Sequence, residues 1–292
     1  MKITKIYLIC LLILLSSTTV YSSPNVLVSI KPLHSITSFL MQGIGKPELL
    51  LTNKQSAHEF NFKISQIKKA SKADLLIYIH PKLETNIKKI ISIVPSIAIG
   101  DNENLIFYKL RADSDRRDWH IWLDLETNAI EIANIIKNKL IEINLKNKNI
   151  YLNNFKLFKK TIHKLNLEFK STFKKYKNIS IATFHDAYQY FEKNYNINNV
   201  LIIEDSDKHN HHHSKLSAKK IINIRSQIKK LKPKCLLGNP EVKIKEVNII
   251  KEDLNLKYFS VDPLGRNIPS SENHYFILLD NITKSIVQCM ND

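Results

Sequence analysis

Hydrophobic residues along the chain alternate between short β-branched runs and longer stretches with helical spacing. Residues 26–30 and 74–79 are apolar runs of strand length, and residues 33–41 carry apolar side chains at intervals of three and four. This alternation predicts parallel strands covered by helices. Further strands are expected at 48–51, 181–184, 200–203, 235–237 and 258–261. Further helices are expected at 64–72, 84–94, 187–195, 217–231 and 275–290.

The middle of the chain has a single, much longer helical pattern. Its apolar residues recur every three or four positions, at Tyr151, Phe155, Phe158, Ile162, Leu165, Phe169, Phe173 and Tyr176. The stripe predicts one amphipathic helix from about residue 147 to 176, roughly 45 Å long. A helical hairpin is the alternative, but neither Gly nor Pro occurs between Gly100 and Pro233 to mark a turn.

These patterns predict an α/β protein of two lobes, each with a small, mostly parallel sheet flanked by helices, joined by one long linking helix. The N-terminal lobe is expected over residues 23–145, the linking helix over 146–178 and the C-terminal lobe over 179–292. A helix of that length, placed between two α/β halves, would act as a stiff strut shared by both.

Residues 1–22 do not fit either lobe. A basic start at 1–5 precedes an apolar run at 6–15 and a small, polar exit at 16–22. This order is typical of a secretory signal peptide. The apolar run is shorter than the ~20 residues of a membrane-spanning helix. We expect cleavage near Ser22 or Ser23 and release of a soluble chain outside the cytoplasm; a buried N-terminal helix is the alternative.

Removal of that segment leaves two cysteines, Cys235 and Cys289. In an oxidising compartment an even pair indicates one disulfide. Two unpaired buried thiols are the alternative. Neither cysteine has a partner at metal-ligand spacing.

The formal net charge of +17 raises the question of a nucleic-acid partner. Lysines occur in nearly every segment, which favours a compositional bias over a built patch, and export argues further against nucleic acid. The chain contains only five glycines, so it has no Gly-rich phosphate loop.

Three histidines, His58, His120 and His185, are candidates for a shared site. They lie more than sixty residues apart, so only tertiary structure can bring them together. His185 directly follows a predicted strand, where open α/β sheets bind ligands. A single histidine beside an apolar strand is more often structural than a ligand, so spacing alone decides little here.

Six segments, in order along the chain, resemble the zinc ABC-transporter substrate-binding proteins (the ZnuA family, solute-binding proteins of metal-binding cluster A-I). The segments are residues 28–34, 56–60, 73–78, 120–123, 184–192 and 261–265. The resemblance implies that His58, His120 and His185 are the zinc ligands. A histidine at the third position is typical of the zinc binders, whereas manganese relatives tend to place a carboxylate there. Cys235 and Cys289 also fall where some members carry a disulfide.

The fourth ligand stays open between three possibilities. Asp262 resembles the position that supplies a carboxylate in related manganese sites, Glu59 is adjacent to the first histidine, and water is the third possibility. Two further features suggest accessory metal binding. His80 stands at a strand end, and a polar stretch contains the cluster His209, His211, His212 and His213.

The resemblance implies a protein without catalytic activity, which binds Zn²⁺ in the periplasm and passes it to a membrane permease with a cytoplasmic ATPase. It would act as a monomer. One alternative is a periplasmic zinc buffer or chaperone without a transporter. The other is a zinc hydrolase, because three histidines and an open position are also the ligand set of catalytic zinc.

Overall fold

The structure is a computed structural model that describes residues 23–51, 57, 60–111, 113–176, 179–197, 200–203 and 217–291. The predicted signal peptide, His58, Glu59 and the cluster from His209 to His213 lie outside the described residues. Within the described part of the chain, no helix is long and apolar enough to span a bilayer.

The first sheet has four strands in the order β2-β1-β3-β4, and all its pairings are parallel. Its strands are β1 (Val26–Val28), β2 (Glu48–Leu49), β3 (Leu75–Tyr78) and β4 (Ser96–Ala98). β1 and β3 are fully buried, which explains their continuous apolar sequences. The sequence patterns predicted three of these strands. They missed β4, a three-residue edge strand with one exposed and two half-buried residues.

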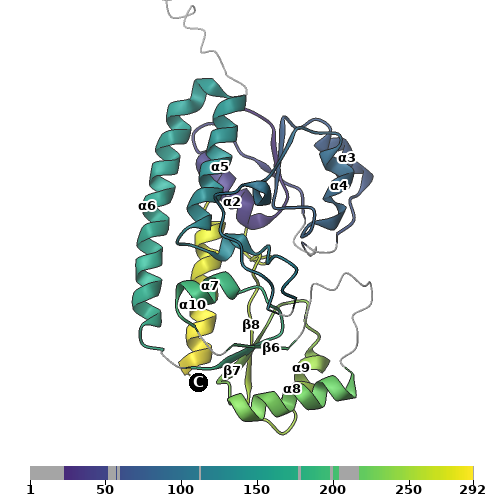
Figure 1. Cartoon of the computed structure of the whole chain (residues 1–292). Coiled ribbons are helices and arrows are strands. Elements are labelled where there is room, and N and C mark those ends of the chain that lie inside the picture. Colours follow the sequence, from purple (N-terminus) through teal and green to yellow (C-terminus); the bar gives the residue numbers. More distant parts are fainter. Residues whose placement is uncertain are drawn as a thin grey trace, which may run out of the picture.

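The second sheet repeats this arrangement in the order β6-β5-β7-β8, again with parallel pairings throughout. Its strands are β5 (Ile181–Thr183), β6 (Val200–Ile202), β7 (Cys235–Gly238) and β8 (Lys257–Ser260). All four coincide with predicted strands. The predicted fold class is therefore confirmed, with two parallel sheets flanked by helices (Figure 1).

The helices cover the sheets and connect their strands, as parallel pairing requires. They are α2 (Lys31–Leu40), α3 (Ile64–Ala70), α4 (Lys88–Ile91), α5 (Asn128–Ile143), α6 (Lys148–Phe173), α7 (Gln189–Asn194), α8 (Ala218–Leu231), α9 (Ile244–Lys251) and α10 (His274–Asn291). Figure 1 shows α3 and α4 on the outer side of the first lobe and α8 and α9 on the outer side of the second.

The long helix α6 confirms the prediction of one uninterrupted element. It has 26 residues, which corresponds to about 39 Å. Figure 1 shows that it extends beside both lobes. Its buried residues follow the predicted stripe and include Tyr151, Phe158, Ile162 and Phe169. A 3-10 turn at Leu145–Asn147 connects it to α5, against which it packs.

A second helix, α10, also joins the lobes. It packs against α2 of the first lobe and against β7 and β8 of the second. The ring of Phe158 on α6 stands edge-on to Phe39 of α2, with centroids 5.6 Å apart, and stacks near Tyr275 of α10. One hydrophobic core therefore continues across both lobes, and a smaller one lies beneath α8 and α9.

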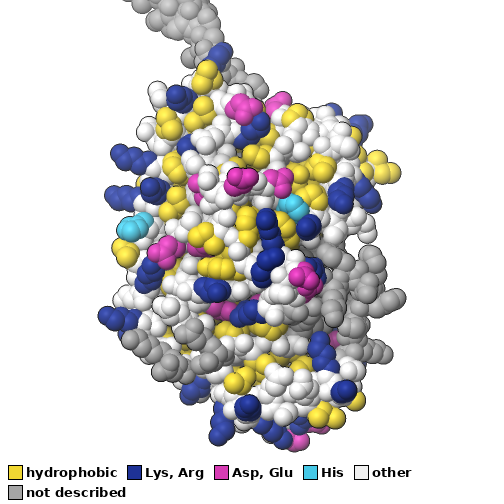
Figure 2. Space-filling view, viewed as in Figure 1, with side chains coloured by type: hydrophobic (Ala, Val, Ile, Leu, Met, Phe, Trp, Pro, Cys, Tyr) yellow, Lys and Arg dark blue, Asp and Glu magenta, His cyan; other side chains and the backbone are white. Residues whose placement is uncertain are grey.

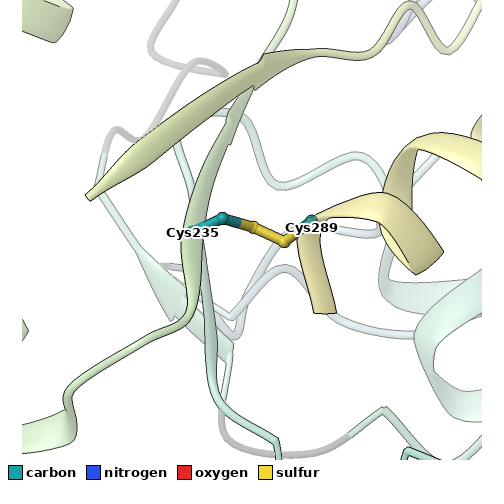
Figure 3. Close-up of a disulfide and its surroundings, with 2 residues drawn as sticks. All are labelled: Cys235 and Cys289. Atoms are coloured by element: carbon teal, nitrogen blue, oxygen red, sulfur yellow. A yellow bond between two sulfur atoms is a disulfide. The ribbon is translucent and has the colours of Figure 1, made fainter. Parts of the chain in front are cut away.

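The predicted disulfide is present between Cys235 and Cys289 (Figure 3). Their Cα atoms are 5.5 Å apart, and 54 residues separate them in sequence. The bond connects β7 to the last turns of α10, and both cysteines are fully buried. It therefore fixes the end of the bridging helix to the second sheet.

Lysine and arginine side chains do not gather in one place on the face shown in Figure 2. They are spread over it, with acidic and hydrophobic side chains between them. This distribution agrees with the interpretation of the +17 charge as a compositional bias.

Candidate metal centre

His120 precedes a short 3-10 turn at Ile121–Leu123 and is oriented by Asp118. Oδ1 of Asp118 accepts hydrogen bonds from the backbone N of His120 at 3.0 Å and from its ring Nδ1 at 2.8 Å. A carboxylate that accepts from Nδ1 fixes the proton on that nitrogen. Nε2 then carries the ring lone pair, which is the atom that a metal binds.

Asp118 is fully buried, and its charge is stabilised chiefly by the ring that it orients. Burial raises the pKa of the Asp118 carboxyl, while its hydrogen bonds to His120 and the charge of that ring act in the opposite direction. Oδ2 faces Nε2 of Gln189 at 3.4 Å. Removing either member of the Asp118–His120 pair would leave the other polar group buried without its main partner.

His185 lies two residues beyond β5, at the carboxyl end of a central strand. The hydroxyl of Thr183 donates to its backbone oxygen at 3.0 Å. Asp186, the next residue, accepts from Nε of Arg111 at 2.8 Å, and Glu192 accepts from Nη1 of Arg111 at 2.6 Å. These bonds attach the loop that carries Arg111 to the segment that carries His185.

The two histidines meet at their Nε2 atoms. Nε2 of His120 lies 3.2 Å from Nε2 of His185, and the rings are nearly perpendicular at 83°. Two imidazole nitrogens bound to one tetrahedral zinc, at 2.0–2.1 Å each, would be about 3.3 Å apart. The observed separation therefore fits two ligands of a single zinc ion.

Both histidines line a small cavity of about 10 Å³, comparable to the space taken by one water molecule. Its lining residues come from both sides of α6 in the sequence: Ala57, His120, Trp122, His185, Asn239, Glu241, Pro263, Leu264 and Arg266. Ala57 is buried and is the residue before His58. The chain next to the first predicted ligand thus reaches the cavity, although His58 itself is outside the described residues.

Two lining residues, Asn239 and Glu241, were missed by sequence reasoning. They follow β7, whose carboxyl end lies beside that of β5. The rule that identifies His185, that ligands bind beyond the carboxyl ends of parallel strands, also applies to these two positions. The strand predicted at residues 235–237 could therefore have identified Asn239 and Glu241 as candidate site residues.

Asp262 lies in the loop after β8, and it is not among the residues that line the described cavity. Its Oδ1 accepts from the backbone N of Leu264 at 3.0 Å. Its Oδ2 accepts from the backbone N of Arg266 at 2.7 Å and from the guanidinium Nε of Arg266 at 3.1 Å. Both carboxylate oxygens are thus engaged within the loop.

His80 is placed apart from the cavity lining. Its ring stacks on Trp119, with centroids 4.0 Å apart and planes only 3° from parallel. Its Nδ1 accepts from the backbone N of Lys82 at 3.0 Å, and its Nε2 is 3.5 Å from Oδ1 of Asp101. Among the described residues, no three His, Cys, Asp or Glu side chains gather in a manner suited to a metal ion.

Two α/β lobes bridged by long helices, with imidazoles converging between them, define the class of the protein as a two-lobed α/β solute-binding protein. The chain belongs to the family described as ZnuA, "Zinc-uptake complex component A periplasmic", which it matches over residues 26–289.

Individual relatives agree with this membership. The high-affinity zinc uptake system protein ZnuA of Brucella suis biovar 1 (strain 1330) is 27% identical, over 91% of this chain and 92% of that protein. The protein of the same name from Haemophilus ducreyi (strain 35000HP) is 26% identical, over 96% and 97%.

Solved structures share the fold at low sequence identity. A crystal structure of ZnuA superposes with a TM-score of 0.78 at 18% identity, covering 92% of this chain and 99% of that one. The laminin-binding protein Lmb of Streptococcus agalactiae gives a TM-score of 0.79 at 21% identity, with the same coverage.

Proposed function

We propose that this protein binds Zn²⁺ in the periplasm and delivers it to an ABC-type importer made of a membrane permease and a cytoplasmic ATPase. The observation that carries the proposal is the 3.2 Å separation between Nε2 of His120 and Nε2 of His185, two buried residues that line a small cavity. Membership of the zinc-uptake family supports zinc as the cargo. The relatives named as high-affinity zinc uptake proteins support it as well.

His58, His120 and His185 are the proposed ligands. Neutral imidazole is a preferred ligand of zinc, whereas manganese prefers carboxylate oxygen. Ala57 at the cavity wall supports His58 as the third contributor. Asp262 is proposed as a conditional fourth ligand, since its oxygens accept three hydrogen bonds within its own loop, two of them from Arg266. While those bonds persist, Glu59 or water is left for the fourth position.

The proposed role involves binding without catalysis. A zinc hydrolase needs a general base beside the open position of the metal. Among the described cavity residues, Glu241 is the only carboxylate, and it is ion-paired with Nη1 of Arg266 at 2.8 Å. That pairing directs the Glu241 carboxylate to Arg266, and it favours a carrier over an enzyme.

The remaining parts of the proposal concern export, oligomeric state and accessory zinc ligands. Residues 1–22 are proposed as the signal peptide that directs export, and the mature chain is proposed to act as a monomer. His80 and the cluster formed by His209, His211, His212 and His213 are proposed as accessory ligands that collect zinc at low affinity. His80 would first have to release the backbone N of Lys82 or turn its Nε2 from Asp101.

Isothermal titration of the zinc-free protein with Zn²⁺ tests the ligand assignment. His120→Ala and His185→Ala should each lower the affinity at least about 100-fold, because each removes one of three strong bonds to the ion. His58→Ala should do the same. His163→Ala, on the exposed face of α6, is the matched control and should leave the affinity unchanged. Wild-type affinity in both His120→Ala and His185→Ala, with circular dichroism unaltered, would refute the proposal.

A further inference from the structure

Arg266 occupies an unusual position, because a cation lines a cavity that is proposed to receive another cation. Its guanidinium lies between two carboxylates. Nε is 3.1 Å from Oδ2 of Asp262, and Nη1 is 2.8 Å from Oε1 of Glu241. The side chains of Arg266 and Asp262 are only 12% and 15% exposed, so water screens their contact weakly, whereas Glu241 is 37% exposed.

The first lobe holds the backbone of this loop in place. Nζ of Lys31, on α2, donates to the backbone oxygens of Arg266 at 2.7 Å and Ile268 at 2.6 Å. The indole Nε1 of Trp122 donates to the oxygen of Pro263 at 2.9 Å. The loop is therefore anchored on both sides of Asp262 and Arg266. Asp262 accepts three hydrogen bonds within this loop, from the backbone N of Leu264, from the backbone N of Arg266 and from the guanidinium, and only the last depends on the side chain of Arg266.

The guanidinium contact affects the identity of the ion. If Arg266 retains both carboxylates, the described residues offer the ion imidazole nitrogen from His120 and His185. If the side chain of Arg266 is absent, Glu241 at the cavity wall and Asp262 in the adjoining loop each lose their guanidinium partner. Imidazole suits zinc, whereas carboxylate suits manganese, and selectivity between divalent metals follows ligand type and geometry more than raw affinity.

We infer that Arg266 is a specificity-determining residue: its guanidinium withholds Asp262 and Glu241 from the bound ion, which keeps the site selective for Zn²⁺ over Mn²⁺. This inference rests on the proposed function, since it concerns the same site. Specificity here comes from an element that disfavours the wrong ion, as in other binding sites that discriminate by repulsion or by withheld contacts.

The test compares the ratio of Kd values for Mn²⁺ and Zn²⁺ in competition titrations against a metal-sensitive dye. Arg266→Met removes the charge and the donors while keeping the length of the side chain. It should lower the Mn²⁺/Zn²⁺ Kd ratio at least about tenfold. The ratio cancels the general gain in affinity that both dications obtain from the loss of a nearby positive charge.

A matched control exists elsewhere in the second lobe. Arg225 on α8 is 20% exposed and pairs with Glu252 at 2.9 Å and with Asp253 at 3.5 Å. Arg225→Met removes an arginine with two carboxylate partners that is not among the cavity-lining residues. It should leave the Mn²⁺/Zn²⁺ ratio at the wild-type value.

The triple variant Arg266→Met, Asp262→Asn, Glu241→Gln identifies the cause. If the freed carboxylates bind Mn²⁺, removing them should return the ratio to within about threefold of wild type. An unchanged ratio in Arg266→Met, or a ratio that stays low in the triple variant, would overturn the inference. Should Arg266→Met fail to fold, Arg266→Gln takes its place under the same criteria. A wild-type protein that does not bind Zn²⁺ would instead overturn the proposed function.

Discussion

His120 receives its orientation from Asp118, two residues earlier in the chain. The carboxylate holds Nδ1, and Nε2 is thereby directed at His185. A charged acceptor at this position also increases the basicity of the ring as a metal ligand. The strength of the zinc site should therefore depend on a residue that does not contact the ion.

Asp118→Asn tests this dependence. The amide oxygen can still accept from Nδ1 of His120, but the negative charge is lost. Zinc affinity, measured by titration calorimetry, should fall about 10- to 100-fold. Asp124→Asn is the control, because Asp124 is also buried in the same segment but accepts from turn residues Glu126 and Thr127. Equal losses in both variants would mean that Asp118 acts on the fold and not on the ligand.

His274 is a buried histidine that supports the loop of Asp262 and Arg266. Its Nε2 pairs with the backbone oxygen of Gly265 at 3.0 Å. Gly265 has a φ of +62°, and a Cβ there would come within 2.8 Å of the His274 ring, so glycine is required. Burial lowers the pKa of His274 to about 4, because the charged form loses its hydration.

The lowered pKa predicts a pH dependence of stability. The folded protein binds the His274 proton more weakly than the unfolded chain does, so its contribution is complete above about pH 6.5 and is lost as the pH falls towards 4. His274→Gln can still donate to Gly265 but does not titrate. In urea titrations, the free energy of unfolding of wild type should decrease relative to that of His274→Gln by on the order of 3 kcal/mol between these pH values.

This difference between the two proteins isolates His274. Burial raises the pKa values of Glu84 and Glu192 to about 7, and such carboxyls favour the folded state as the pH falls. Their contributions are present in both proteins and cancel. A wild-type curve parallel to that of His274→Gln would contradict the prediction.

Among individual residues, the sequence analysis identified those that lie in recognisable motifs and missed those whose role depends on loop geometry. His120 and His185 lie in motifs, and their Nε2 atoms are 3.2 Å apart in the structure. Arg266 and Glu241 carry no motif, since their pairing arises only when the loops after β7 and β8 come together. The sequence around Asp262 did not indicate that the side chain of Arg266, four residues further along the chain, would form an ion pair with it.

Helix α6 shows how a single element joins the lobes. Phe158 is fully buried and touches Phe39 of α2 and Phe276 of α10, so it belongs to the core that both lobes share. Its neighbour Leu157 projects to the side, away from this core, and is 52% exposed. Substitution of these two adjacent residues therefore separates the effect of burial on stability from the effect of helix propensity.

Phe158→Ala should lower the free energy of unfolding by about 3–5 kcal/mol, from lost burial and the cavity that remains. Leu157→Ala should change it by less than about 0.5 kcal/mol, because exposed substitutions of good helix formers are nearly neutral. Chemical denaturation followed by circular dichroism measures both. Similar losses in the two variants would show that α6 is not packed as described.

Two elements that the sequence analysis missed, α9 and β4, have no regular pattern of buried apolar residues. On α9, Ile244 and Ile249 are exposed, at 62% and 43%, so its apolar residues do not form one stripe. β4 is three residues long and lies at the sheet edge. By contrast, α5 places Ile132 and Ile136 on its buried face at helical spacing, so that helix could have been predicted.

The two lobes are less separate than the sequence suggests. Alternating strands and helices on either side of α6 predict two sheets, and both are present. The pattern does not reveal that α10, from the end of the chain, returns to pack on α2 near its beginning. That packing merges the cores of the two lobes, and the hydrogen bond from the backbone N of Tyr275 to Oγ of Ser35 at 2.9 Å reinforces it.

A continuous core predicts that the described lobes unfold together, because neither can expose its share of the core alone. The only two tryptophans, Trp119 and Trp122, are buried in the first half of the chain next to the proposed site. Their fluorescence therefore reports on that region, while far-UV circular dichroism reports on helices in both lobes. With the disulfide intact, the two thermal transitions should coincide.

Zinc should shift both transitions by the same amount, since its proposed ligands are drawn from both lobes. Free Zn²⁺ at 100 times its Kd should add about 2.7 kcal/mol to the free energy of unfolding. His120→Ala should retain the coincidence of the two signals and lose the shift. If the tryptophan signal changes first, at a lower temperature than the circular dichroism, the first lobe opens independently. A protein of that kind would bind its ion by closing one lobe on the other, whereas a shared core restricts the response to the loops that carry the ligands.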